Sequence, residues 1–379
     1  MKRLTFIATN EFDAFAGSEI LWAEVAGRLA LQGCEVSVNT PQWSAEPDRI
    51  SRLRGQERVR IETRPTALPI SRRVLSKAGL ICAESFFARY REEYIRKTRP
   101  NLVVISQGGL VDGVGWMEAC SSVGVPFVVI VHLVADALWP SLDSATRSNA
   151  IYPFASKVYF VSDENRISAG RQLGMDFANS AIVRNPFNVS FDTQIEWPPE
   201  TGDWKLACVG RLGVEHKGQD LLVEVLSSSK WRERNLSVTL FGQGHHREYL
   251  DRLIAIRDCK NILFGGYTNG IPEVWRGHHA AIMPSRYEGL PIALVEAMIC
   301  NRMAIVTDVG GNTELIQDGV TGFVAPFPNF DSLDSILEKA WAHREDWRSM
   351  GRDSGTLIRK IIPRDPIQEF IESIKSIIP

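Results

Sequence analysis

Two segments in the second half of the chain combine permanent cations, carboxylates and glycines at the ends of apolar runs. In the first, the run Leu206–Val209 leads into the loop Gly210–Gly218, which carries Arg211 and Lys217. Arg can hold a phosphate through two hydrogen bonds and Lys acts as a point charge, so the loop is suited to a phosphate or diphosphate. The competing interpretation is a solvated turn in which Arg211 pairs with Glu215.

The second segment, Pro284–Met298, places one glutamate before an expected helix and another inside it. We expect the N–H groups of Gly289 and Leu290 to be free at the helix start, where they would take an anion or a sugar hydroxyl. Glu296 lies between apolar residues, and a buried carboxylate is costly without a partner such as a polyhydroxylated ligand. The alternatives are a capping role for Glu288 and an ion pair in the core for Glu296.

Together these segments resemble the family-4 retaining glycosyltransferases of GT-B fold. The resemblance rests on the run Gly210–Asp220 and, about seventy residues later, on Pro284–Met298. The second run contains the E-x7-E pattern of that family, here Glu288 and Glu296. The similarity is dense over residues 205–326 and looser over the first half of the chain.

The resemblance implies a role for each of these residues towards a nucleoside-diphosphate sugar. Arg211 and Lys217 would bind the diphosphate and stabilise it as it leaves. Glu296 would hold the ribose hydroxyls, and Glu288 would hold a hydroxyl of the donor sugar. The other donor-binding residues implied in this half are Gly210, Gly289, Leu290 and, near the base, Tyr267.

In the first half, the resemblance implies two further site residues. Gly17, in the first loop, would close onto the phosphates, although Ala16 stands where the family usually has another glycine. His132 ends an apolar run and would face the donor sugar and the acceptor.

No D-x-D sequence occurs in the chain, so a metal clamp on the diphosphate is not expected. Arg211 and Lys217 would supply that charge stabilisation instead. We therefore expect catalysis without a metal or any other cofactor. The resemblance also implies retention of the anomeric configuration, with the departing phosphate helping to deprotonate the acceptor.

The elements expected to position these residues alternate between short apolar runs and helical stretches. Runs such as Leu4–Ala8, Leu102–Ser106 and Phe127–Val131 lack polar alternation, which fits strands buried on both faces of a parallel sheet. The same alternation of expected strands and helices in both halves predicts an α/β protein with two Rossmann-like, doubly wound domains facing a cleft, as in the GT-B fold that the resemblance implies. The Pro- and Gly-containing segment 196–203 is the expected linker.

The predicted domains are an acceptor-side domain over residues 1–197 and a donor domain over residues 204–362. Residues 363–379 form a final helix with one apolar face, which is expected to pack back on the first domain.

Composition narrows the class of partner. The 379 residues carry a net charge of −2, which argues against a nucleic-acid binder. Scattered single cysteines and no apolar run of about 18 residues predict a cytoplasmic protein without a membrane span.

Residues 49–99 form a basic region, with 14 Lys and Arg against five Asp and Glu. This basic, partly aromatic region is a candidate for peripheral contact with an anionic inner membrane face, and the acceptor is expected to be a glycan, lipid-linked or envelope molecule.

Other interpretations stay open. The same fold could belong to a nucleotide-sugar 2-epimerase or to a catalytically silent sugar-nucleotide-binding protein. A dinucleotide-binding dehydrogenase is poorly supported, because Gly242-x-Gly244 lacks the third glycine of its fingerprint. The pairs His245–His246 and His278–His279 lack four-ligand metal spacing. UDP or GDP is the favoured nucleotide of the donor, but no residue in the sequence identifies the base or the sugar.

Overall fold

The computed structural model describes residues 2–10, 17–43, 46–65, 67, 83–199 and 201–378. Its contacts divide the chain into two units, Met1–Pro186 with Asp365–Pro379, and Phe187–Arg364. The segment before the expected linker belongs to the second unit because arginines of that unit hold its backbone. Arg302 donates to Glu196 O, and Arg359 donates to Phe191 O.

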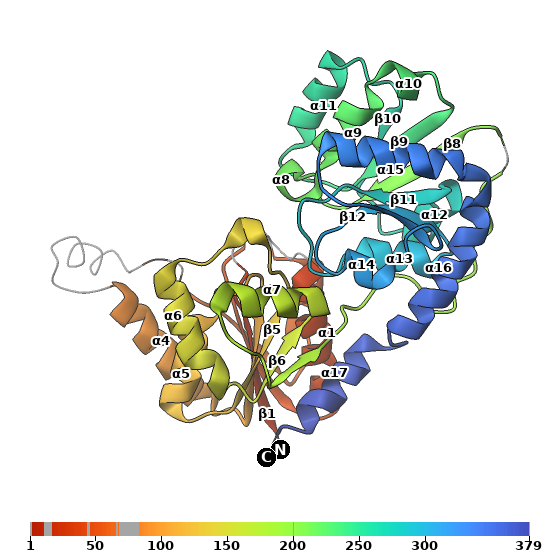
Figure 1. Ribbon diagram of the computed structural model, residues 1–379. Coiled ribbons are helices and arrows are strands. Elements are labelled where there is room, and N and C mark those ends of the chain that lie inside the picture. Colours follow the sequence, from red (N-terminus) through yellow and green to blue (C-terminus); the bar gives the residue numbers. More distant parts are fainter. Residues whose placement is uncertain are drawn as a thin grey trace. The chain divides into compact units, whose positions relative to one another are not determined.

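The first unit is built on a seven-stranded parallel sheet with strand order β3-β2-β1-β4-β5-β6-β7 (Figure 1). Alternate residues of one strand enter different cores, Val104 on one face and Val103 on the other. Both faces are therefore covered by helices, as the uninterrupted apolar runs predict. The strands are β1 Arg3–Ala8, β2 Glu35–Thr40, β3 Val59–Thr63, β4 Leu102–Gln107, β5 Phe127–Val131, β6 Lys157–Phe160 and β7 Ser180–Ile182.

Helices from both ends of the chain cover one face of this sheet. α1 (Gly17–Leu31), α2 (Asp48–Arg54) and α17 (Pro366–Lys375) share a core with it. Phe370 of α17 meets Tyr159 edge to face, with ring centroids 4.9 Å apart. The opposite face packs against α4 Ala83–Thr98, α5 Val114–Val123, α6 Leu142–Ile151 and α7 Asp163–Leu173. The last helix of the chain is thus part of the first unit's core.

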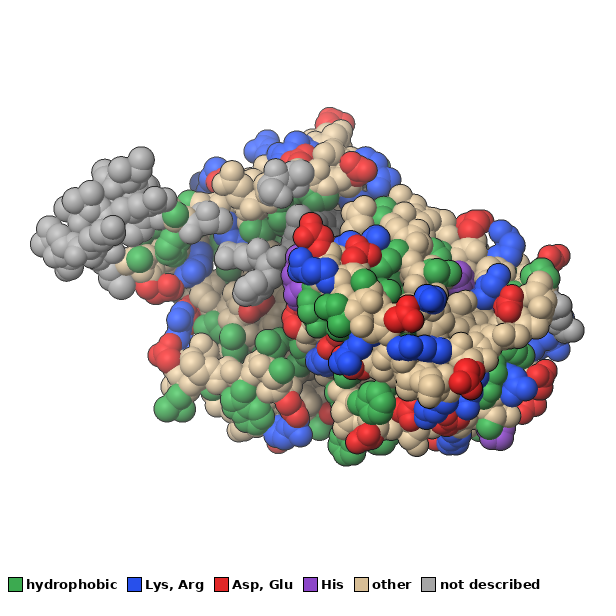
Figure 2. Space-filling model, turned by 90° about the horizontal axis from the view of Figure 1, so that it is seen from above, with side chains coloured by type: hydrophobic (Ala, Val, Ile, Leu, Met, Phe, Trp, Pro, Cys, Tyr) green, Lys and Arg blue, Asp and Glu red, His purple; other side chains and the backbone are tan. Residues whose placement is uncertain are grey.

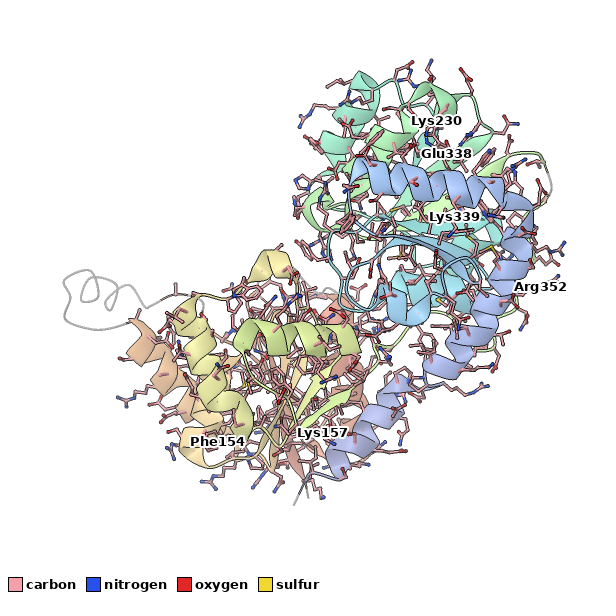
Figure 3. All side chains as sticks on the ribbon, viewed as in Figure 1. Phe154, Lys157, Lys230, Glu338, Lys339 and Arg352 are labelled. Atoms are coloured by element: carbon pink, nitrogen blue, oxygen red, sulfur yellow. The ribbon has the colours of Figure 1, made fainter. Side chains whose placement is uncertain are left out.

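The second unit has a six-stranded parallel sheet, in the order β10-β9-β8-β11-β12-β13. Its strands are β8 Trp204–Val209, β9 Leu236–Phe241, β10 Ile262–Gly266, β11 Ala280–Met283, β12 Met303–Thr307 and β13 Gly322–Ala325. Its helices are α8 Val214–Lys217, α9 Gln219–Leu226, α10 Ser229–Arg232, α11 Arg247–Ile256, α12 Ile271–Gly277, α13 Ile292–Ile299, α14 Asn312–Leu315, α15 Phe330–Ala342 and α16 Trp347–Ile361. Lys230 of α10 reaches Glu338 of α15 at 3.0 Å, which ties these two helices together (Figure 3).

Only part of the basic region 49–99 is described, because residue 66 and residues 68–82 lie outside the described residues. In α4 the cations meet carboxylates, as in the pairs Arg89–Glu93 and Lys97–Glu62, both at 2.7 Å. Tyr94 of the same helix is buried against Trp116. Figure 2 shows Lys and Arg side chains interspersed with Asp and Glu on the described residues in view. Among the described helices, none has the length and apolar content to cross a membrane.

Candidate functional site

Three of the predicted site residues, Arg211, Lys217 and Glu288, follow two neighbouring strands at the centre of the second sheet. β8 pairs with β11 on one side and with β9 on the other, so the chain changes direction across the sheet at β8. Ligands of open α/β sheets bind outside the carboxyl ends of the strands at such a switch point. The loop after β8 carries Arg211 and leads into α8 and Lys217, while the loop after β11 carries Glu288.

Glycines allow these loops to approach one another at backbone distance. A Cβ on Gly218 would lie 2.0 Å from Pro284 O, and one on Gly242 would lie 2.0 Å from Gly210 O. Arg286 N also donates to His216 O at 2.8 Å, which joins the β8 and β11 loops directly. The two loops therefore meet at backbone distance, which brings their side chains within reach of one another.

Glu288 and Lys217 contact each other in this arrangement. Lys217 Nζ lies 2.6 Å from Glu288 Oε1, which also accepts from Ser285 Oγ at 2.7 Å. His216 Nε2 lies 3.6 Å from Glu288 Oε2. Burial alone would raise the pKa of this carboxyl, which is 4% exposed, but the charge of Lys217 and the nearby His216 outweigh burial and lower the pKa to about 2. Glu288 is therefore an ionised, paired carboxylate and not a helix cap.

An arginine fork fixes the turn that presents Lys217. Arg286 donates to both carboxylate oxygens of Asp220, each at 2.7 Å, and also to Val214 O at the start of α8. Such two-point pairs restrict geometry as well as adding energy. Sequence analysis did not single out Arg286 or Asp220, because an arginine and an aspartate so far apart in sequence give no local signal of pairing.

Arg211 is partly buried at the beginning of the same loop. Its carbonyl oxygen accepts from Gln219 Nε2 at 2.8 Å, so the loop is closed across α8. Glu215, the partner suggested for it in a solvated turn, lies within ion-pair distance of His245 and His246.

Glu296 lies inside α13 and is 2% exposed. Its Oε1 accepts from both the backbone N–H and the side-chain amide of Asn188, each at 2.8 Å. These neutral donors only partly offset burial, which raises the pKa of Glu296 to about 7. The partner is thus an amide and not the cation considered above, and Asn188 was missed because it lies far earlier in the chain.

The helix that follows Glu288 begins later than the sequence predicts. Pro291 has an extended backbone, with φ −72° and ψ 121°, and α13 starts at Ile292 and not at Leu290. Gly289 and Leu290 therefore belong to the loop ahead of the helix, and the predicted start of the helix is two residues too early. Gly289 O accepts from Gly311 N at 2.8 Å.

Tyr267 lies apart from this group in the sheet. It follows the edge strand β10, two strands away from β8, and is 63% exposed. Its hydroxyl donates to Asn269 Oδ1 at 2.8 Å.

The first unit places its two predicted residues at the carboxyl ends of central strands or just after them. Gly17 is the first residue of α1, and Ala16 lies outside the described residues. His132 directly follows β5, and its Nε2 lies 3.2 Å from Ser106 Oγ. Burial lowers the pKa of His132 to about 3, so its ring is neutral and can exchange hydrogen bonds but carries no charge.

Two doubly wound parallel sheets, each with polar residues at its carboxyl edge, define a GT-B fold, which confirms the predicted class. Across 99% of this chain and all of the other, the protein resembles Anabaena Alr3699/HepE in complex with UDP-glucose, with a TM-score of 0.75 and 16% identity. It resembles a glycosyltransferase from Rickettsia africae over 99% of this chain and 98% of the other, with a TM-score of 0.76 and 16% identity.

Residues 191–354 match the family model of the glycosyl transferases group 1, which confirms the resemblance noted in the sequence. The chain is 33% identical to the alpha-D-kanosaminyltransferase of Streptomyces kanamyceticus over 31% of each protein. It is 30% identical to a GDP-mannose-dependent phosphatidylinositol monomannoside mannosyltransferase of Mycolicibacterium smegmatis, over 38% of this chain and 41% of the relative. The matches thus span between about a third and two fifths of these relatives.

Proposed function

We propose that this protein is a retaining glycosyltransferase that moves a sugar from a nucleoside-diphosphate donor to an acceptor hydroxyl. The observation that carries the proposal is the contact between Lys217 and Glu288 at the switch point of the second sheet. A partly buried cation, 18% exposed, and a buried carboxylate are costly to hold there unless they do something besides filling a core. A diphosphate and a sugar hydroxyl are the two groups that such a pair would bind side by side.

In this proposal Arg211 and Lys217 act on the leaving diphosphate. When the bond between the anomeric carbon and the phosphate oxygen breaks, its electron pair stays on the phosphate. Fixed cations aimed at that oxygen lower the barrier because they interact more strongly with the transition state than with the bound donor. The acceptor hydroxyl forms the new bond on the same face of the sugar, and its proton passes to the departing phosphate. No metal or cofactor takes part in these steps.

The two glutamates recognise different parts of the donor. Glu288 accepts a hydroxyl of the sugar, beside the loop residues Gly289 and Leu290. Glu296, with Asn188, accepts the ribose hydroxyls. Gly17 and His132 are proposed to contribute to the donor and acceptor from the first unit, and Tyr267 to lie near the base.

UDP and GDP are the proposed nucleotides. The Anabaena protein forms a complex with UDP-glucose, and the mycobacterial relative is GDP-mannose-dependent. A panel of UDP, GDP, ADP and TDP in thermal unfolding tests the choice, because a ligand at 100 times its Kd adds about 2.7 kcal/mol to stability. Stabilisation by none of them would contradict the donor site itself.

The acceptor is proposed to be a glycan, lipid-linked or envelope molecule, reached through contact of residues 49–99 with an anionic surface. Sedimentation with vesicles of anionic lipid, compared with neutral vesicles, tests that contact.

A protein that binds a nucleotide sugar but never cleaves it would instead be the catalytically silent sugar-nucleotide-binding protein.

A further inference from the structure

Two histidines and a glutamate meet on the second unit outside the residues assigned to the donor. Glu215 lies in α8, and His245 and His246 lie in the loop between β9 and α11 (Figure 1). Each of the three offers a ligand atom, and these atoms all lie within 4.8 Å of one another. No local spacing predicts this group, because α9, α10 and β9 separate Glu215 from the two histidines in the chain.

The contacts within the group leave room for a cation between the nitrogen and oxygen atoms. Glu215 Oε1 lies 3.3 Å from His245 Nε2, and Oε2 lies 2.8 Å from His246 Nδ1. In a tetrahedral zinc site the ligand distances of about 2.0–2.2 Å place neighbouring N and O atoms about 3.4 Å apart. The first pair already has that spacing, and the second needs to open by about 0.6 Å.

His246 Nδ1 has two close polar neighbours, Glu215 Oε2 at 2.8 Å and Val214 N at 3.2 Å. A ring nitrogen serves one of them at a time, either by donating a proton to the carboxylate or by accepting from Val214 N. A metal ion bound to Nδ1 and to the carboxylate would take the place of the proton between His246 and Glu215.

We propose that Glu215, His245 and His246 form a binding site for a transition-metal dication, with water completing the coordination. Two imidazoles and a carboxylate favour Zn²⁺, whereas Mg²⁺ prefers an all-oxygen set. Arg211 also lies near this group, because a Cβ on Gly213 would lie 3.3 Å from Glu215 Oε1 and 3.4 Å from Arg211 Nε. Its positive charge repels any dication, so we expect only a strongly coordinated ion to bind.

The bound ion would join two loops at the carboxyl edge of the second sheet. The ligands come from α8 and from the β9–α11 loop, which are already in contact through His246 N and Leu212 O at 3.1 Å. The ion's role is structural: it stabilises the turn without entering glycosyl transfer, so the proposal stands or falls independently of the proposed function.

Calorimetric titration of the EDTA-treated full chain with Zn²⁺ tests the site. We expect one Zn²⁺ per chain and no binding of Mg²⁺. His245→Ala removes an exposed ligand and should weaken Zn²⁺ binding by at least about 10-fold, since even partners behind a ligand cost 10–100-fold. His246→Gln is the second variant, and His343→Ala is the matched control, because His343 is also exposed and lies 3.7 Å from the carboxylate of Asp346.

Three results would overturn the proposal. They are the absence of Zn²⁺ binding by the wild type, equal binding by wild type and both ligand variants, and a thiolate-to-metal charge-transfer band in the Co²⁺ complex, which would assign the ion to a cysteine.

Discussion

The carboxyl edges of the two sheets bury the same kind of residue in opposite electrostatic states. In the second unit Glu288 contacts Lys217 at 2.6 Å, and its pKa falls to about 2. In the first unit Glu19 of α1 is 1% exposed and accepts from Trp22 Nε1 at 2.6 Å. Burial raises the pKa of Glu19 to about 7, because hydrogen bonds from Trp22 and Ser18 and the more distant charge of Arg64 do not compensate.

This difference separates two ways of using a buried acid. A carboxylate held ionised beside a lysine forms part of a charged site, into which a diphosphate and a sugar can enter by exchanging partners. In the first unit, by contrast, Glu19 is protonated below about pH 7 and the ring of His132 is neutral, while the buried Arg64 donates to Ala8 O. This contrast supports the proposal that the diphosphate of the donor binds beside Lys217 in the second unit.

Lys217→Ala should have the largest effect of these variants, on both turnover and stability. Removal of a group that stabilises developing charge typically costs on the order of 10²–10³ in kcat. The variant also leaves Glu288 buried without its partner, which should lower the free energy of unfolding by about 3–5 kcal/mol. Turnover and denaturant unfolding measure the two effects separately.

Two further variants separate loss of function from loss of stability. Lys230→Ala is the control, because Lys230 also pairs with carboxylates but is 41% exposed, and it should cost less than about 1 kcal/mol. Lys217→Ala combined with Glu288→Gln should recover much of the stability and none of the turnover. Recovery of turnover in this double variant would mean that the pair is structural only.

Buried carboxyls with raised pKa values and those with lowered pKa values should make stability change with pH in opposite directions. Glu19 and Glu296 have folded-state pKa values raised from 4.5 to about 7, so the stability they contribute is complete below pH 4.5 and is lost as the pH rises through about 7. At 1.36 kcal/mol for each pKa unit, the loss is about 3 kcal/mol for each carboxyl as an upper value. Glu288 behaves in the reverse sense, and its contribution is lost as the pH falls from 4.5 to about 2.

Denaturant unfolding between pH 2 and pH 8 measures these contributions. Glu19→Gln and Glu296→Gln should each flatten the decline above pH 4.5, and Glu288→Gln should flatten only the acid limb. An unchanged profile in Glu296→Gln would show that this carboxyl is not held protonated.

Removal of metal ions should have the smallest effect on turnover. With Arg211 and Lys217 as the counter-charges of the diphosphate, activity should survive saturating EDTA. Loss of the ion proposed for Glu215, His245 and His246 should lower thermal stability while turnover at moderate temperature is unchanged. Turnover that disappears with EDTA and returns with Mg²⁺ or Mn²⁺ would contradict this account of the charges.

Much of the fold and part of the site follow from local sequence. Apolar runs gave most of the central strands, but β3, β7 and β13 were not predicted. Val59–Thr63 alternates with charged residues, and Ser180–Ile182 is very short. Edge strands of this kind carry little hydrophobic signal, because fewer neighbours bury them.

The candidate site residues Arg211, Lys217 and Glu288, which the sequence predicts, lie in short connections that follow a strand. The contacts that it missed join segments distant in the chain. The hydrogen bonds from Asn188 to Glu296 and the fork from Arg286 to Asp220 depend on how the sheet brings loops together. No local spacing rule contains that information. The start of α13 was also missed, because the backbone of Pro291 is extended and the helix begins only at Ile292.

The central claim is that Glu296 recognises the nucleoside and Glu288 the sugar, and calorimetric titration of two variants tests it most directly. At pH 8, above its pKa of about 7, Glu296 is ionised, and Glu296→Gln should weaken binding of the free nucleoside diphosphate by about 1.5–3 kcal/mol, the value of a hydrogen bond to a charged group. Glu288→Gln should leave that affinity nearly unchanged and weaken only the intact nucleotide sugar. If Glu288→Gln loses the free nucleotide while Glu296→Gln keeps it, the two roles are reversed. If neither variant changes either affinity, the paired glutamates are structural and the proposed donor site is wrong.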